Sequence, residues 1–256
     1  MVNGTVLVTG ATGTLGREVV RLLVARGVAV RGLSRRVRGG GDGVEWVVGD
    51  LVTGAGIAEA MAGVEVVVDC ATTQKKADVA GVRTLVARAR EAGVRHLVYV
   101  SIVGIDRVPI AYYGAKLACE SVVRESGLGW SVLRATQFHD LLLRFFDAGV
   151  RLPVFPVLGG VRFQPVDVRE VAEAVAGLVG EEPVGFAPEV GGPQVRSYRE
   201  LARAYLRAAG KRRVLLPLWI PGAGGRGLRG GGLLAPGRAV GRGTFEEALE
   251  RRFGQR

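Results

Sequence analysis

Short apolar segments alternate with amphipathic segments through the first 135 residues of this chain. The apolar segments are rich in valine and almost uninterrupted, which is typical of parallel strands that are covered on both faces. They predict strands at residues 4–9, 28–33, 44–48, 64–69, 95–101 and 130–134. The amphipathic segments predict helices at residues 14–26, 54–62, 78–92 and 111–126. This alternation favours an α/β fold built on a doubly wound parallel sheet.

Glycine follows each of the four predicted helices, at Gly27, Gly63, Gly93 and Gly127, where a left-handed backbone often ends a helix. After residue 136 the pattern predicts helices at residues 137–148, 167–180 and 197–209, with prolines between them. The glycine-rich stretch 221–232 is expected to form a flexible loop or linker. We therefore expect a core at residues 1–150 and a small substrate-side lobe at 151–256, joined in one integrated domain.

The first strand is followed by three glycines at a spacing of three, Gly10, Gly13 and Gly16, and then by a helix pattern. A strand, a tight turn and a helix N-terminus in this order direct backbone N–H groups and a helix dipole at one point, where a pyrophosphate binds. Gly10 would make the turn, Gly13 would admit the phosphates and Gly16 would let the helix pack on the strand. The loop predicts dinucleotide binding through residues 10–16, including Thr12, Thr14 and Leu15, although a plain glycine-rich turn has the same spacing.

Composition limits the other classes of function. About 48% of the 256 residues are hydrophobic, but no apolar run approaches the roughly 18 residues of a membrane span. We expect a cytoplasmic protein without a targeting segment or a membrane partner. We also expect no metal site, because Cys70 and Cys119 are far apart and do not have the spacing of metal ligands. The net charge is +11, and residues 196–256 alone carry +10. A solvated arginine-rich surface explains this charge better than nucleic acid binding, because no nucleic-acid motif accompanies it, but an acidic partner or anionic ligand stays open.

The ends of the second, third and fourth predicted strands suggest how a dinucleotide would be held. Ser34 and Arg35 follow the second strand, where an NAD-binding fold usually has an acidic residue, so they favour the 2′-phosphate of NADP(H) over NAD(H). Asp50, with Leu51, follows the third strand and would accept from the adenine amino group or cap the next helix. The small residues Ala71 and Thr72 follow the fourth strand and would let the cofactor lie over the sheet.

Candidate catalytic residues follow the fifth strand. Ser101 ends this strand, and Tyr112 and Lys116 are four residues apart, so they share one face of a helix. A tyrosine can protonate a carbonyl oxygen that receives hydride if a nearby ammonium lowers its pKa. Lys116 would also hold the nicotinamide ribose, and Ser101 would polarise the carbonyl. Tyr113 competes with Tyr112, and both tyrosines can instead be half-buried helix residues.

These motifs together resemble the short-chain dehydrogenase/reductase superfamily, and most closely its atypical, NmrA-like NAD(P)-binding branch. The resemblance spans about residues 4–210 and includes two further segments, residues 131–138 and 164–168. It implies a Rossmann-type fold, a place for Thr136 near the nicotinamide, and a helix beside the substrate cleft after residue 167. The short interval between Ser101 and Tyr112 departs from the classical geometry, and members of this branch often lack the tyrosine.

The expected function is an NADP(H)-dependent reductase of a small carbonyl or quinone-like compound, acting by hydride transfer. Two alternatives remain at this point. The first is a non-catalytic NADP(H) sensor of the NmrA-like type, and the second is an epimerase or dehydratase that retains its cofactor. A homodimer is possible, with residues 78–92 and 111–126 pairing between copies.

Overall fold

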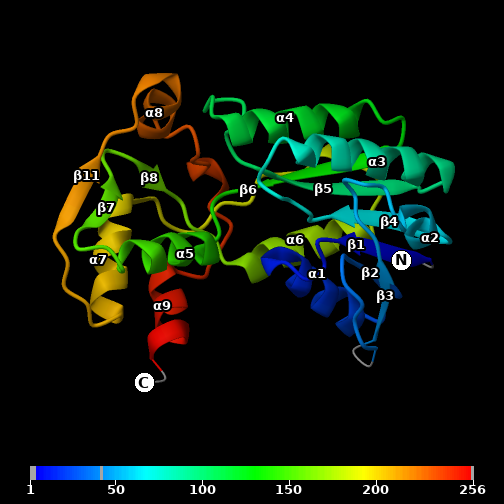
Figure 1. Cartoon of the computed structure of the whole chain (residues 1–256), viewed down its shortest axis with the longest axis horizontal. Coiled ribbons are helices and arrows are strands. Elements are labelled where there is room, and N and C mark those ends of the chain that lie inside the picture. Colours follow the sequence, from blue (N-terminus) through cyan, green and yellow to red (C-terminus); the bar gives the residue numbers. More distant parts are fainter. Residues whose placement is uncertain (1–3, 41–42, 255–256) are drawn as a thin grey trace. The chain divides into compact units, whose positions relative to one another are not determined.

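A parallel sheet of seven strands is the centre of the part of the chain that the computed structural model describes, residues 4–40 and 43–254 (Figure 1). The strand order is β3-β2-β1-β4-β5-β6-β9. The strands are β1 (Thr5–Thr9), β2 (Val30–Ser34), β3 (Val44–Val48), β4 (Val64–Asp69), β5 (His96–Ile102), β6 (Gly129–Ala135) and β9 (Gly185–Phe186). The first six begin and end within two residues of the predicted bounds, and the predicted doubly wound sheet is confirmed.

Helices cover both faces of this sheet. Figure 1 shows α3 (Ala77–Glu91) and α4 (Ala111–Arg124) side by side on one face, and α1 (Thr14–Ala25) and α6 (Val168–Val179) on the other. The short α2 (Ile57–Met61) follows β3. Gly27, Gly63, Gly93 and Gly127 all have positive φ, between 69° and 74°, which confirms the predicted helix ends. The inner strands β1 and β4 are therefore buried on both sides, as their valine-rich sequences indicate.

The chain forms two compact units. The first comprises the chain up to Ser101 together with Ala111–Arg134 and Val171–Pro188. The second comprises Ile102–Ile110, Ala135–Glu170 and the chain from Glu189 onwards. The chain thus passes between the units several times, rather than once near residue 150 as the sequence suggests. Among the described residues, no helix is long and apolar enough to cross a bilayer.

The second unit is built around aromatic side chains. Its helices are α5 (His139–Gly149), α7 (Tyr198–Ala208), α8 (Gly222–Arg229) and α9 (Phe245–Phe253), with a 3-10 turn at Pro236–Arg238. Its strands are β7 (Phe155–Leu158), β8 (Arg162–Phe163), β10 (Arg196–Ser197) and β11 (Leu215–Leu218). The ring of the fully buried Phe146 lies 5.1–6.1 Å from those of Phe155, Tyr198, Tyr205 and Phe245, which fixes α5 and α7 around a common core.

Helix α8 corrects the expectation of a flexible segment at residues 221–232. Its glycines bring the helix against the segment that ends at Ile110: a Cβ on Gly224 would lie 2.8 Å from the Ile110 side chain, and one on Gly227 would lie 2.9 Å from the Arg107 carbonyl. A Cβ on Gly225 would lie 1.8 Å from the Ile220 carbonyl. The glycines of α8 therefore serve close packing, and that packing outweighs their poor helix propensity.

Two buried histidines make the stability of the fold depend on pH. Burial lowers the pKa of His96, in β5, and of His139, at the start of α5, below the ordinary 6.5. The unfolded chain therefore binds protons that the folded chain does not, so stability present above about pH 6.5 is lost as the pH falls. Each histidine should contribute about 1.4 kcal/mol per pH unit in that range. We expect His139→Leu to flatten the change in unfolding free energy between about pH 7 and 5, measured by urea denaturation. An unchanged slope would contradict this assignment.

Candidate dinucleotide site and catalytic residues

The glycine-rich loop joins β1 to α1 through one tight turn. Gly10 has a φ of +58°, and the Gly13 amide donates to the Gly10 carbonyl over 2.8 Å. A Cβ on Gly10 would lie 2.7 Å from the Cys70 carbonyl, and one on Gly16 would lie 2.2 Å from the Gly10 carbonyl. Gly10 and Gly16 therefore close the turn against the end of β4 and against the helix. A Cβ on Gly13 would meet only the Gly10 carbonyl, at 3.1 Å, so the outer side of the loop stays open.

The N-terminus of α1 is built to face an anion. Gly13 is the N-cap, it provides no side-chain cap, and the first turn of α1 contains no acidic residue. Thr12 and Gly13 are exposed, Thr14 is half-buried, and Leu15 is buried in the core, where it can offer only its backbone. The uncapped amides and the positive end of the helix dipole are suited to phosphate oxygens.

This loop lies where the sheet order reverses. β1 pairs with β2 on one side and with β4 on the other, so the connections after β1 and β4 leave in different directions. The last residues of these two strands are joined, because the Thr9 hydroxyl donates to the buried Asp69 carboxylate. The Ala71 amide also donates to Asp69, over 3.2 Å. Ligands of doubly wound sheets bind at this position, beyond the carboxyl ends of the strands.

The residues predicted to hold the adenosine half of the cofactor lie at the carboxyl ends of β2 and β3. Ser34 is buried, and its hydroxyl accepts from the Arg36 amide over 3.2 Å, while Arg35 is exposed. Asp50 does not cap α2, because the N-cap of that helix is Gly56 and makes no side-chain contact. Its carboxylate instead accepts from the Val52 amide over 2.7 Å and orders the turn that contains the half-buried Leu51.

Lys116 is held inside the first unit. Its Nζ donates to the Val100 carbonyl over 2.7 Å and lies 4.1 Å from the centre of the Tyr99 ring. Burial lowers the pKa of Lys116, and the negative charge of Asp69 opposes that shift. Burial also raises the pKa of Asp69. The ammonium of Lys116 is therefore held at the end of β5 by the Val100 carbonyl and not by the Tyr112 hydroxyl.

Tyr112 lies beside Thr72, with 3.5 Å between their hydroxyl oxygens, which is a weak contact. Thr72 in turn donates to Asp78 over 2.7 Å. Burial raises the pKa of Tyr112, and Lys116 is not among the groups that shift it. The expectation that Lys116 lowers this pKa is therefore wrong, because the ammonium is turned toward Val100. Burial also raises the pKa of the neighbouring Tyr113, to about 12.

Ser101 is the last residue of β5 that belongs to the first unit, because the following Ile102 belongs to the second. It is buried, and its hydroxyl has no hydrogen-bond partner in the described part of the chain. An unpartnered buried hydroxyl is costly, so it is suited to a ligand group that can supply the missing partner. Ser101 follows Val100, whose carbonyl holds Lys116. The end of β5 thus orders two of the three candidate catalytic residues.

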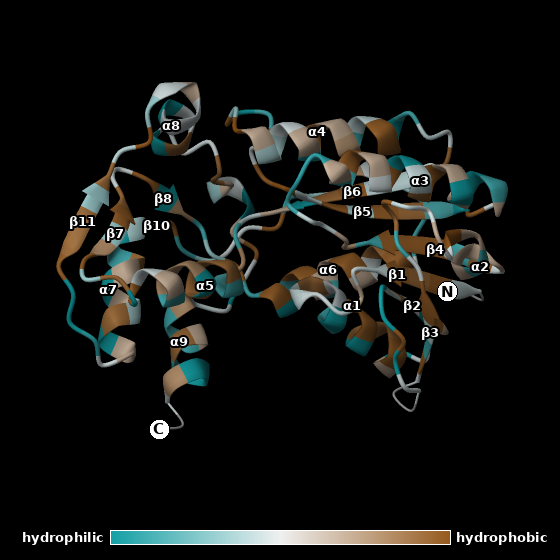
Figure 2. Cartoon of the chain, viewed as in Figure 1, coloured by the Kyte–Doolittle hydropathy of each residue, from teal (hydrophilic) through white to brown (hydrophobic). Residues whose placement is uncertain are grey.

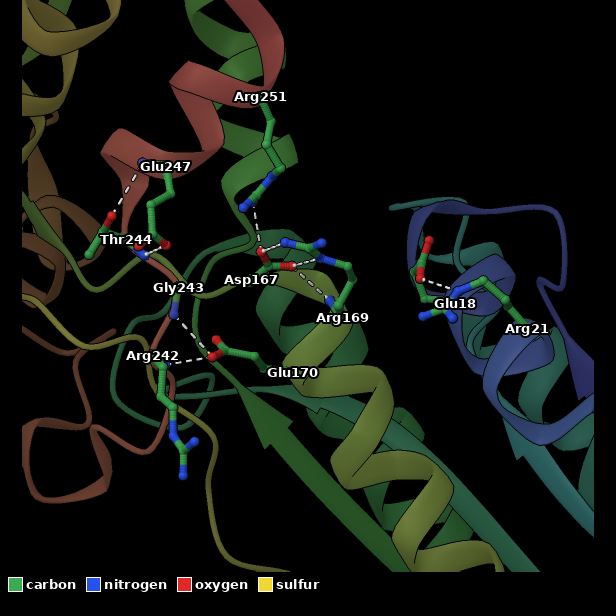
Figure 3. A network of polar contacts seen from close by, with 10 residues as sticks. All are labelled: Glu18, Arg21, Asp167, Arg169, Glu170, Arg242, Gly243, Thr244, Glu247 and Arg251. Atoms are coloured by element: carbon green, nitrogen blue, oxygen red, sulfur yellow. Dashed lines mark hydrogen bonds and ion pairs between the residues drawn. The ribbon is translucent and has the colours of Figure 1, made fainter. Parts of the chain in front are cut away.

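Thr136 and Asp167 belong to the second unit and have structural contacts there. The buried Thr136 hydroxyl donates to the Gln164 carbonyl over 2.6 Å. Figure 3 shows the Asp167 carboxylate between Arg169 and Arg251, with each guanidinium 2.7 Å away. Burial alone would raise the pKa of Asp167, but the hydrogen bonds and charges of the arginines bring it down to about 2. Asp167 thereby ties α9 to the start of α6.

Sequence reasoning did not assign Thr9, Asp69, Tyr99 or Asp78, which order the candidate site. Thr9 and Asp69 are polar residues at the carboxyl ends of largely apolar strands, and that pattern was the available signal. Asp78 carries no such signal. It accepts from the Thr73 amide over 2.7 Å and from Thr72, so it fixes the loop after β4 through contacts that only the fold creates.

Comparison with known proteins identifies the family. A profile of NAD(P)H-binding proteins matches residues 10–144, from the glycine-rich loop into α5. The (4-alkanoyl-5-oxo-2,5-dihydrofuran-3-yl)methyl phosphate reductase of Streptomyces griseus is 34% identical over 218 residues, which cover 80% of this chain and 74% of that reductase. This chain belongs to the NAD(P)H-binding family. Its cofactor is therefore a nicotinamide dinucleotide, as the loop predicts.

Two further matches agree with the NAD(P)H-binding family. The NAD(P)H azoreductase of Xenophilus azovorans is 31% identical over 214 residues, with 80% of this chain and 74% of that enzyme covered. The crystal structure of an NADPH-dependent quinone oxidoreductase from Escherichia coli, complexed with NADPH, superposes with a TM-score of 0.80. It is 20% identical and covers 97% of this chain and 99% of that one. The Rossmann-type fold is thereby confirmed.

Proposed function

We propose that this protein is an NADP(H)-dependent reductase of a small carbonyl or quinone-like compound, of the NmrA-like branch of the short-chain dehydrogenase/reductases. The observation that carries the proposal is the open loop at Gly13, on an uncapped helix N-terminus at the reversal point of the sheet. The matched reductases of Streptomyces griseus and Xenophilus azovorans support a reduction reaction, since each is named for one.

The residues present fit a dinucleotide. The amides of the glycine-rich loop would bind the pyrophosphate, and the small residues Ala71 and Thr72 would let the cofactor lie over the sheet. When bound, the cofactor supplies the hydride. Lys116 would bind the ribose hydroxyls after leaving the Val100 carbonyl, and the free hydroxyl of Ser101 would donate to the substrate oxygen.

Tyr112 would act as the proton donor. Its raised pKa keeps the phenol protonated at neutral pH, so the proton is present to be donated, while burial makes the phenol a weaker acid than an ordinary tyrosine. The weak hydroxyl contact to Thr72, which is itself bound to Asp78, places the phenol beside the loop after β4. The residue roles proposed here therefore keep Tyr112 but separate its acidity from Lys116.

The test is consumption of NADPH with a panel of quinone, aldehyde and ketone acceptors, followed by absorbance. Turnover with at least one acceptor class is expected. Tight NADPH binding without turnover of any acceptor would overturn the reductase and favour the non-catalytic sensor. The contact between Lys116 and Val100 gives that alternative some support, because it leaves the ammonium away from Tyr112.

Arg35 gives a separate prediction about cofactor choice. Because Arg35 is exposed at the end of β2, its guanidinium is free to approach a 2′-phosphate. We expect Arg35→Gln to weaken NADPH binding about tenfold, or about 1.4 kcal/mol, and to leave NADH binding unchanged. Isothermal calorimetry with both cofactors measures this. Arg38→Gln is the matched control, because Arg38 lies in the same loop but stacks on the Trp46 ring at 5.3 Å. An equal loss in both variants would show that general charge and not a phosphate contact is responsible.

A further inference from the structure

The second unit carries an exposed apolar surface that its own fold does not cover. β7 and β11 pair in parallel as a two-stranded sheet, with Leu216 beside Pro156 and Leu218 beside Leu158. Phe155 and Val157 point into the aromatic core, so the alternate residues face outward. Leu216 and Leu218 are each 46% exposed, and the adjoining Val214 and Trp219 are 73% and 66% exposed. We call Pro156, Leu158, Val214, Leu216, Leu218 and Trp219 the apolar face.

A concentrated positive charge adjoins the apolar face. α7 and the segment after it line a hollow of about 440 Å³, and Val214 and Leu215 form part of its wall. All six charged residues that line this hollow are basic: Arg199, Arg203, Arg207, Lys211, Arg212 and Arg213. Three of them recur every fourth residue on one side of α7, and the other three lead directly into β11. Figure 2 shows the hydrophilic segment after α7 running into the apolar strand β11. We call these six residues the basic hollow.

We propose that the apolar face and the basic hollow form a docking surface for a bilayer leaflet with anionic headgroups. Charge complementarity selects this partner, because clustered arginine and lysine are attracted to anionic lipid while exposed leucine, valine and tryptophan enter the headgroup region. Tryptophan at the boundary of an apolar surface is typical of such interfaces. A second copy of this chain fits less well, since a molecule with the same net charge of +11 offers the basic hollow no surplus of negative charge.

The proposed attachment is peripheral, and it is compatible with the absence of a spanning helix in the described residues. It replaces the expectation of a protein with no membrane partner. It does not rest on the proposed reductase function, because every residue of the surface lies in the second unit, outside the glycine-rich loop and away from Tyr112 and Lys116 in the sequence. A protein without reductase activity could carry the same surface.

Flotation with vesicles tests the proposal on the full-length protein. We expect binding to phosphatidylcholine vesicles that contain phosphatidylglycerol, little binding to pure phosphatidylcholine, and weakening by added salt. Arg203→Gln combined with Arg212→Gln should lower the affinity at least about tenfold. Arg83→Gln combined with Arg90→Gln removes the same charge from exposed positions of α3 and should change it little. Leu216→Thr combined with Leu218→Thr should also weaken binding, because it removes apolar contact and keeps strand-forming residues.

Tryptophan fluorescence gives a second readout. The chain has three tryptophans, Trp46 in β3, Trp130 in β6 and Trp219 after β11. The emission should shift to shorter wavelength on anionic vesicles, and Trp219→Phe should abolish that shift.

Several results would overturn the proposal. Absence of binding to anionic vesicles would overturn it. An equal loss of affinity in the α3 control would also overturn it, because the proposed surface would then contribute no more to binding than other basic positions. Displacement by inorganic phosphate would indicate a site for small anions, and equally tight binding of polyglutamate would indicate an acidic polypeptide partner. Unchanged vesicle binding by the variant Leu216→Thr combined with Leu218→Thr would mean that the apolar face does not contact the membrane. A dimer that this variant dissociates would identify the face as a contact between copies.

Discussion

Gly13→Ala should leave the protein folded and weaken NADPH binding roughly a hundredfold, or about 2.7 kcal/mol. Gly13 has φ −77° and ψ 176°, which alanine adopts without strain, and its Cβ would meet only the Gly10 carbonyl, at 3.1 Å. The methyl group would instead occupy the space through which the pyrophosphate approaches the loop. Calorimetric titration with NADPH gives the binding constant, and urea unfolding gives the stability.

Gly16→Ala and Gly177→Ala are the matched comparisons for this prediction. A Cβ on Gly16 would lie 2.2 Å from the Gly10 carbonyl, so Gly16→Ala should lower the unfolding free energy by about 3 kcal/mol or more. Gly177 is exposed in α6 with open space around it, so alanine there should stabilise the protein by up to about 1 kcal/mol. If Gly13→Ala binds NADPH as the wild type does, the phosphates do not contact this loop.

Tyr112→Phe should lower kcat about a hundredfold or more for an accepted substrate, with little change in NADPH affinity. The substitution removes only the phenolic hydroxyl, and the ring, whose centre lies 5.8 Å from that of Tyr113, keeps its packing. Because burial raises the pKa of Tyr112 above its ordinary 10, the wild-type rate should not fall from loss of the phenolic proton until the pH is above 10. Steady-state kinetics across that pH range measures both effects.

Tyr113→Phe is the control for the catalytic prediction, since it deletes the adjacent hydroxyl from the same helix. It should retain nearly full activity. The opposite result, with Tyr113→Phe inactive and Tyr112→Phe active, would move the proton donor to Tyr113. Full activity of both variants would mean that neither tyrosine donates the proton and that the reduction uses another group.

The sheet could be predicted because its signal is local. Runs of valine such as residues 64–69 indicate buried parallel strands, and the glycines at 10, 13 and 16 have few other uses between a strand and a helix. The positions of Ser101, Tyr112 and Lys116 also followed from the ends of these elements. What the pattern could not supply was the direction of a side chain. Lys116 and Tyr112 share one helix, yet the ammonium donates to Val100 and the phenol lies beside Thr72.

Two other features were hidden because they depend on contacts distant in sequence. The helix α8 has a composition that predicts a linker, and only the close approach of its glycines to the backbone near Arg107 explains it. Asp69 is likewise an ordinary end-of-strand residue until the hydroxyl of Thr9, 60 residues earlier, is brought to it. Propensity describes a segment in isolation, whereas both of these features arise from packing.

The order in which the segments of the two units leave the ribosome constrains how the chain folds during its synthesis. Val171–Pro188 belongs to the first unit, but it emerges only after α5, β7 and β8 of the second. Until then the nascent sheet lacks β9 at its edge, and it also lacks α6, whose buried Val171, Ala172 and Val175 cover it. The first unit cannot complete its folding before translation has passed residue 188, and by then the first segments of the second unit have already emerged and still await the residues from Glu189 onwards.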